Sequence, residues 1–175
     1  MEKTQTRLPS GGGDGQVAIL FVCMGNICRS PAAEGYMRHL LAQRGLSGRI
    51  RVDSAGTLGY HAGSPPDSRM IHEAARRGYE LKHAARQVQP SDFDRFHYII
   101  AMDEDNLNYL KAMPRNSDGK AYVGLLLDEW PEAPVREVPD PYYGRTQEAF
   151  RKSLDLIERG CEALLARILR THDIA

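Results

Sequence analysis

The sequence has few cysteines and no excess of charge of either sign. Its 175 residues include three cysteines, and 23 Lys and Arg residues balance 23 Asp and Glu residues. Three cysteines, two of them in one short segment, do not make the framework of a disulfide-stabilised secreted domain. A net charge of zero provides no overall field to attract nucleic acid or an anionic membrane, so we expect neither as a partner.

Long hydrophobic runs and metal-binding patterns are lacking as well. No apolar stretch approaches the ~20 residues of a membrane-spanning helix, and the N-terminus has no hydrophobic signal core, so we expect a cytoplasmic protein. The six histidines show no spacing typical of a metal site. The acidic segment that begins at Asp103 lacks the glycine and the glutamate of a calcium loop, so we expect no metal.

The first sixteen residues differ in composition from the rest of the chain. They contain the glycine-rich segment 11–15 and almost no apolar side chains. Such a segment cannot offset the entropy cost of ordering, so we expect a flexible leader at residues 1–16. The 42% hydrophobic content of the chain is typical of a globular protein, and its length predicts one domain, over residues 17–171.

The most informative segment combines a strand, a short loop and a helix start. The apolar, β-branched run from Val17 to Val22 predicts a strand buried on both faces. Ser30 and Pro31 are typical of the N-cap and first residue of a helix. Because backbone N–H groups converge without partners at a helix start, the loop between them predicts an anion site.

A thiol stands at the entrance of this loop and an arginine at its end. Arg29 could bind two oxygens of an anion with its fork of N–H groups. A helix N-terminus and a nearby arginine favour the thiolate form of cysteine, so we expect Cys23 to be a nucleophile. Gly25 allows close backbone approach, and Asn26 tolerates left-handed dihedral angles. The alternative is a buried cysteine that only fills space.

The segment from Cys23 to Pro31, Cys-Met-Gly-Asn-Ile-Cys-Arg-Ser-Pro, closely resembles the phosphate loop of the low-molecular-weight protein tyrosine phosphatases. The resemblance covers about Val17 to Leu169, with four more motifs in that family's order: Asp53-Ser-Ala-Gly56, His83-Ala-Ala-Arg-Gln87, Ala101-Met-Asp-Glu104 and Asp140-Pro-Tyr-Tyr-Gly144. It implies that residues 17–171 form a phosphatase domain. It also implies a set of phosphate-binding residues: Met24, Gly25, Asn26, Ile27, Cys28, Arg29 and Ser30.

The resemblance further implies a hydrolysis with two chemical steps. Cys23 would attack phosphorus to give a cysteinyl-phosphate, and Arg29 would stabilise the equatorial oxygens. The proline-bracketed Asp140 would protonate the leaving oxygen and then activate water. By spacing alone, Asp140 is equally well an aspartate before a turn. The implied substrate is a phosphotyrosine protein or a small aryl phosphate, the product is inorganic phosphate, and no cofactor is needed.

Other residues of the matching motifs would support this chemistry. Ser30 would donate a hydrogen bond to the thiolate, and Asp103 would anchor the loop region. Ser54 and His83 would hydrogen-bond within the network of Asn26, although each has an ordinary structural alternative. The residues implied as an aromatic wall beside the substrate are Tyr60, Tyr142 and Tyr143.

The second cysteine of the loop suggests a redox role. An exposed, ionised thiol is prone to oxidation. We hypothesise that Cys28 captures an oxidised Cys23 as a reversible disulfide; the alternative is a packed loop thiol. Cys161 lies on the apolar stripe of the last predicted helix, which favours an inert core position.

Buried strands separated by helical segments predict an α/β fold. We expect a four-stranded parallel sheet with helices on both faces, and a ligand beyond the carboxyl ends of the strands. The expected strands are 17–23, 50–53, 97–102 and 120–127. The expected helices are 31–44, 66–78, 90–96, 103–111 and 146–170.

Three alternative functions fit the sequence less well. A thiol-dependent arsenate reductase shares this fold and loop, but its relay needs further cysteines where residues 29–160 contain none. A non-catalytic phosphate-binding module would not need Cys23, Arg29 and Asp140 together. A nucleotide-binding loop would end in Gly-Lys-Ser or Gly-Lys-Thr, which is absent. We expect the protein to be a monomer.

Overall fold

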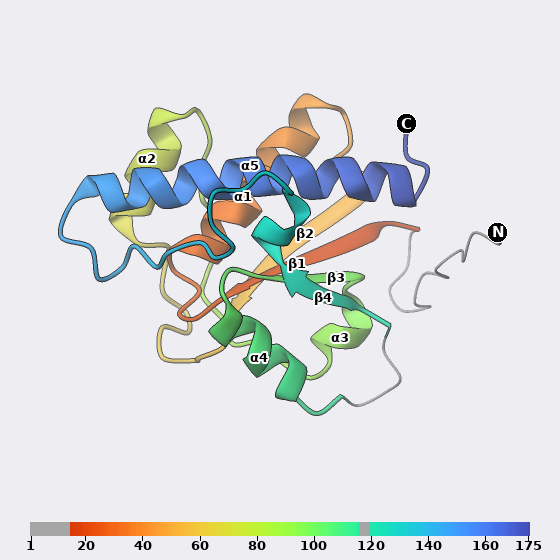
Figure 1. Ribbon diagram of the computed structural model, residues 1–175, viewed down its shortest axis with the longest axis horizontal. Coiled ribbons are helices and arrows are strands. Elements are labelled where there is room, and N and C mark those ends of the chain that lie inside the picture. The colour runs from red at the N-terminus through yellow and green to blue at the C-terminus, as the bar shows by residue number, and fades with distance from the viewer. Residues whose placement is uncertain (1–14, 116–119) are drawn as a thin grey trace.

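The computed structural model describes residues 15–115 and 120–175, so all but the last two residues of the predicted leader lie outside it. Strands and helices alternate along most of the chain (Figure 1). The strands are β1 (Val17–Cys23), β2 (Ile50–Gly56), β3 (Tyr98–Ala101) and β4 (Tyr122–Leu125). The helices are α1 (Arg29–Gln43), α2 (Ser68–Arg76), α3 (Asp92–Arg95), α4 (Glu104–Ala112), the 3₁₀ helix η1 (Leu126–Glu129) and α5 (Gln147–Thr171).

The strands form one parallel sheet, as the sequence predicts, and the structure places them in the order β2-β1-β3-β4. β1 is central, and all seven of its residues are buried. Its register places Cys23 opposite Gly56 of β2, while Val22 lies opposite Ala101 of β3. The carboxyl ends of three strands therefore meet around Cys23, where an open parallel sheet binds ligands.

Helices cover both faces of the sheet. α1, α2 and α5 lie on one side, and α3 and α4 lie on the other (Figure 1). The alternation of β1 divides its side chains between two cores: Ile19 and Phe21 pack toward α1 and α5, whereas Leu20 and Val22 pack toward α3 and α4. Each such side chain contributes about 1.5–3 kcal/mol on burial. Among the described helices, none is both long and apolar enough to cross a membrane.

Most boundaries differ by one to three residues from the sequence-based expectations, and three of these differences have a clear physical reason. α1 begins at Arg29 with Cys28 as its N-cap, so the prediction that Ser30 caps the helix is wrong. The Ser30 hydroxyl is instead hydrogen-bonded inside the loop. β2 continues to Gly56 because that residue still pairs with β1, and its N–H donates to the carbonyl of Arg86. β4 ends at Leu125, because the chain then turns into η1.

Candidate active site

The loop between β1 and α1 wraps around an open cradle. Its backbone takes a left-handed conformation at Asn26, where φ is 56°. Cys28 holds the N-cap position of α1, and its side chain makes no capping hydrogen bond in the described structure. The first backbone N–H groups of α1 therefore remain available to an anion.

The nucleophile candidate is buried and paired with a hydroxyl. The Cys23 sulfur lies 3.0 Å from Ser30 Oγ. Asn26 Nδ2 donates to the same Oγ at 2.8 Å. Because Ser30 accepts from Asn26, its one hydroxyl proton can point either at the sulfur or at the Ala55 carbonyl, which is 3.4 Å from Ser30 Oγ. The hydroxyl therefore lies where it can hydrogen-bond the sulfur of the nucleophile candidate.

The side chain of Asn26 is held at both ends. Its Nδ2 also donates to Ser54 Oγ at 3.0 Å, and its Oδ1 accepts from the Arg86 backbone N–H. His83 Nε2 lies 2.7 Å from the same Oδ1, so the predicted contacts of Ser54 and His83 with Asn26 are present. Glu34 completes the network, because it accepts from Ser54 Oγ and lies 3.1 Å from His83 Nδ1.

One cluster of side chains in this network has the composition of a metal site. It consists of Glu34, Asp53 and His83, whose possible ligand atoms lie within 4.8 Å of one another. Both carboxylates are already paired with arginine. Arg38 Nη1 lies 2.7 Å from Glu34, and Arg86 Nη2 lies 3.1 Å from Asp53. Two guanidinium groups beside the cluster oppose a further cation, so we interpret it as an ion-pair network.

Arg29 links the loop to the segments that follow β3 and η1. Its buried guanidinium donates through Nη1 to Asp103 Oδ2 at 2.7 Å and to the Val138 carbonyl at 3.0 Å. Its Nη2 lies 3.4 Å from Asp140 Oδ2. Burial disfavours the charge, but the negative groups of Cys23, Asp140 and Asp103 outweigh burial and raise the pKa of Arg29. The arginine therefore stays positive and is fixed in orientation.

The predicted nucleophile, arginine and acid line one narrow cavity of about 40 Å³. Asp140 is oriented by the Tyr142 backbone N–H, which donates to its Oδ1 at 3.1 Å. The rings of Tyr142 and Tyr143 stand nearly perpendicular, 5.1 Å apart. The full lining is Cys23, Met24, Gly25, Ile27, Cys28, Arg29, His61, Asp140, Tyr142 and Tyr143.

One predicted wall residue lies outside this cavity. Tyr60 is 87% exposed, and its ring packs edge-on against His61 at 4.9 Å. His61 lines the cavity instead, because its ring turns inward over Gly25. In an irregular loop, no periodicity fixes which of two neighbouring rings points inward, so the sequence motif did not distinguish Tyr60 from His61.

Cys28 lines the same cavity as Cys23 but has a different environment. Burial, together with the negative charge of Asp67, raises the pKa of the Cys28 thiol well above its ordinary value. Cys28 is therefore a protonated thiol beside the nucleophile. Cys161 packs in the core, as predicted, and burial raises its pKa too.

The N-terminus of α2 ties the two sides of the cavity together, a role that sequence analysis missed. The Asp67 N–H donates to the Ile27 carbonyl at 2.7 Å, and the Asp67 carboxylate binds the Arg69 side chain. This hydrogen bond lowers the pKa of Asp67. Arg69 in turn donates to the carbonyls of Tyr142 and Gly144. An arginine two residues after an N-cap has no distinctive sequence signal.

Comparisons with known proteins agree with this geometry. The family model described as "Low molecular weight phosphotyrosine protein phosphatase" matches residues 18–173. The chain is 43% identical over 159 residues to the low molecular weight protein-tyrosine-phosphatase YfkJ of Bacillus subtilis, covering 90% of this chain and 99% of the relative. It is 40% identical to the human low molecular weight phosphotyrosine protein phosphatase, covering 86% and 94%.

Solved structures show the same similarity. The crystal structure of YfkJ matches with a TM-score of 0.82 at 42% identity, covering 91% of this chain and 98% of that one. A protein tyrosine phosphatase from Entamoeba histolytica matches with a TM-score of 0.82 at 40% identity. The match covers 89% of this chain and 98% of the Entamoeba chain.

Proposed function

Because the chain belongs to the low molecular weight phosphotyrosine protein phosphatase family, we propose that its cavity hydrolyses phosphotyrosine through a phosphorylated Cys23. The chain is a protein tyrosine phosphatase, and therefore a hydrolase of phosphoric monoesters. The observation that carries the assignment of residues is that Cys23, Arg29 and Asp140 line one cavity. We assign residues 17–171 as the phosphatase domain.

In the first step, the Cys23 sulfur attacks phosphorus. The S–P bond forms as the bond between phosphorus and the aryl oxygen breaks. Asp140 gives its proton to that oxygen, so the leaving group departs as a neutral phenol. Arg29 and the backbone N–H groups at the start of α1 stabilise the charge on the three equatorial oxygens.

In the second step, the ionised Asp140 takes a proton from water while the water oxygen attacks phosphorus. The S–P bond breaks, inorganic phosphate is released, and the sulfur leaves as a thiolate. The hydrogen bond from Ser30 Oγ supports this departure, because it is 3.0 Å from the sulfur and strengthens as negative charge returns. The nucleophile, the acid and the positive charge all come from the chain's own side chains.

Substrate selection follows from the lining of the cavity. Tyr142, Tyr143 and His61 surround a narrow opening and offer ring surfaces on which an aryl group can pack. This supports a phosphotyrosine protein or a small aryl phosphate as substrate. We propose that the protein acts as a monomer, since each residue assigned a chemical role comes from the same chain.

The experiment compares the wild type with Cys23→Ser, Asp140→Ala and the isosteric Asp140→Asn on a series of aryl phosphates. We expect near-complete loss for Cys23→Ser. For both Asp140 variants, the rate of hydrolysis should fall about 10²-fold or more on substrates with basic leaving groups. The fall should be smaller as the leaving group becomes more acidic. A deficit that is constant across leaving groups would show that Asp140 is not the acid.

A further inference from the structure

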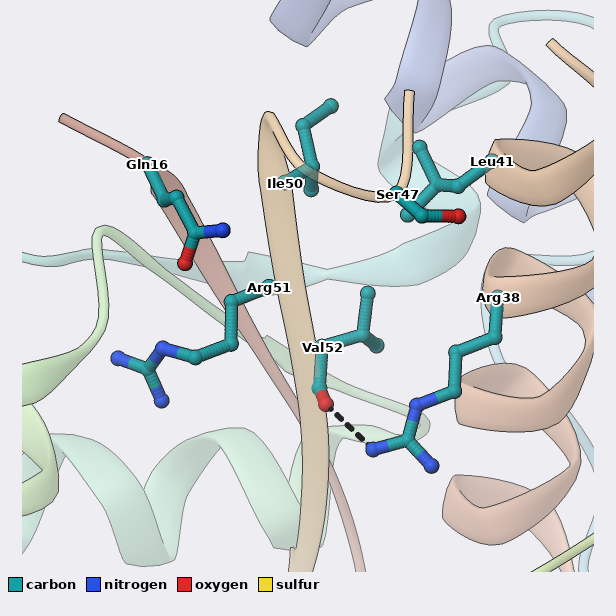
Figure 2. A pocket seen from close by; sticks show the side chains of 7 residues that line it. All are labelled: Gln16, Arg38, Leu41, Ser47, Ile50, Arg51 and Val52. Atoms are coloured by element: carbon teal, nitrogen blue, oxygen red, sulfur yellow. Dashed lines mark hydrogen bonds between the residues drawn. The ribbon is translucent and has the colours of Figure 1, made fainter. Parts of the chain in front are cut away.

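A second cavity lies at the open edge of the sheet, away from Cys23. It has a volume of about 310 Å³ and lies beside the first half of the edge strand β2 (Figure 2). Cys23 pairs with Gly56, four to six residues further along β2, so at roughly 3.3 Å per residue the cavity is about 13–20 Å from the active site. The lining residues are Gln16, Arg38, Leu41, Ser47, Ile50, Arg51 and Val52.

This cavity, the β2 groove, lies in a locally basic part of a neutral chain. Residues 35–52 contain four arginines and no aspartate or glutamate. The four arginines are all exposed: Arg38, Arg44, Arg49 and Arg51. The preceding acid, Glu34, is buried beneath them. The groove therefore presents positive charge to solvent although the whole protein has none in excess.

The two arginines of the groove are oriented by contacts that leave N–H groups for another acceptor. Arg38, on α1, and Arg51, on β2, lie on either side of the β2 backbone (Figure 2). Arg38 donates to the Val52 carbonyl at 2.9 Å and pairs with Glu34 at 2.7 Å, whereas Arg51 donates only to the Arg95 carbonyl, at 2.8 Å, among the side-chain hydrogen bonds of the described residues. Each guanidinium has five donors in a rigid fork that matches a carboxylate. The lining also includes the apolar side chains of Leu41, Ile50 and Val52, each of which is buried.

We propose that the β2 groove binds an acidic, extended segment of the phosphotyrosine protein on which the active site acts. The proposal rests on the proposed function, because it assigns a second point of contact to the same substrate. An extended chain fits along an edge strand, and its carboxylates would pair with the exposed arginines on and beside β2, Arg51 and Arg49 above all.

Charge complementarity favours a peptide over a polynucleotide or a bilayer, both of which need a broad basic face. The segment that follows the opposite edge strand, β4, has more acids than bases. From η1 to the active-site loop it contains Asp128, Glu129, Glu132 and Glu137 against one arginine, Arg136, which pairs with Asp128. A short acidic peptide can use the local basic region without approaching that edge.

The test uses two phosphotyrosine peptides, one with three glutamates about six residues from the phosphotyrosine and one with three glutamines in their place. We expect the wild type to prefer the glutamate peptide by about five-fold in kcat/KM, mainly through KM, and to lose this preference in high salt. The variant Arg49→Gln/Arg51→Gln should lose the preference while hydrolysing p-nitrophenyl phosphate normally. Arg38 is left unchanged because it contacts Glu34 in the network around His83.

The control is Lys111→Gln/Lys120→Gln, which removes two exposed charges outside the groove. Equal loss of preference in this control would show a general electrostatic effect and overturn the proposal, as would an unchanged preference in the arginine variant. Binding of phosphatidylserine vesicles in place of the acidic peptide would overturn it as well. Fluorescence anisotropy with the unphosphorylated glutamate peptide measures binding without catalysis, so it separates failure of the groove from failure of the proposed function.

Discussion

At the scale of single residues, Asn26 determines the shape of the phosphate loop. It adopts a left-handed conformation that most residues avoid, and its amide contacts Ser30, Ser54, His83 and the Arg86 backbone. These contacts offset the cost of the conformation, of order 1–3 kcal/mol. The same amide donates to Ser30 Oγ, which lies 3.0 Å from the Cys23 sulfur, so one side chain both shapes the loop and positions the hydroxyl beside the nucleophile.

The environment of Cys28 allows a test of whether this residue protects Cys23 from irreversible oxidation. Peroxide converts the Cys23 thiolate to a sulfenic acid, and attack by the Cys28 sulfur would form a disulfide and release water. The attacking form is a thiolate, and burial raises the pKa of Cys28. Capture is therefore slow at neutral pH and becomes faster as the pH rises.

We expect the wild type to recover more activity than Cys28→Ser after peroxide and then dithiothreitol, with a larger difference at pH 9 than at pH 7. The measurement is the recovered rate of aryl phosphate hydrolysis, with mass spectrometry of the disulfide. Cys161→Ser is the matched control, because Cys161 is equally buried but lies in the core. Equal recovery of wild type and Cys28→Ser would dismiss the idea.

At the scale of elements, α2 connects the phosphate loop to the loop that carries Asp140. We expect Arg69→Met to lower kcat about 10-fold for substrates with basic leaving groups, because the loop of Tyr142 and Gly144 loses two hydrogen bonds. Arg69→Lys should retain part of the activity, since it keeps the charge beside Asp67 but lacks the fork. Steady-state kinetics with leaving groups of different acidity measure the effect.

The exposed Arg145→Met, in the same segment, is the control. Because the Arg69 side chain is 38% exposed, we expect the free energy of unfolding to fall by less than about 1 kcal/mol. If Arg69→Met lowers the free energy of unfolding but its effect on kcat does not depend on the leaving group, the role of Arg69 is structural alone.

The elements also show why some features were predictable from sequence and others were not. β1, the phosphate loop and α1 follow from local signals: a buried apolar run, a turn and a helix start. The length of β2 depends on Gly56 accepting a hydrogen bond from Val88, a contact between distant segments. The inward orientation of His61 and the contacts of Arg69 likewise depend on tertiary structure that no local pattern encodes.

At the scale of the whole molecule, two half-buried histidines at the end of the sheet opposite the active site make stability depend on pH. The Ala18 N–H donates to His97 Nδ1 at 2.8 Å, and His172 Nε2 lies 2.7 Å from the Tyr98 hydroxyl. Burial lowers the pKa of both histidines below the ordinary value of 6.5. At acidic pH the folded state then binds fewer protons than the unfolded state. The contribution of these histidines to the stability of the folded state is therefore complete above about pH 6.5, and it is lost as the pH falls from there through their lowered pKa values.

We expect the free energy of unfolding, measured with urea, to decrease between pH 7 and pH 5. The free energy of unfolding of His97→Asn should decrease less over the same range. The asparagine amide oxygen can still accept a hydrogen bond from the Ala18 N–H, but the amide does not titrate. The exposed His72→Asn is the control and should follow the wild type. The same slope in His97→Asn and wild type would mean that other groups cause the acid sensitivity.

The position of β1 has a consequence for how the enzyme can be inactivated. All seven of its buried residues pair with β2, and the four from Ile19 to Val22 pair with β3 as well, so the amide hydrogens of these four should exchange with deuterium only when the entire fold opens. Cys23 is the last residue of that strand, whereas Asp140 is on a partly exposed loop. Local fluctuations can therefore disengage the proton donor without displacing the sulfur.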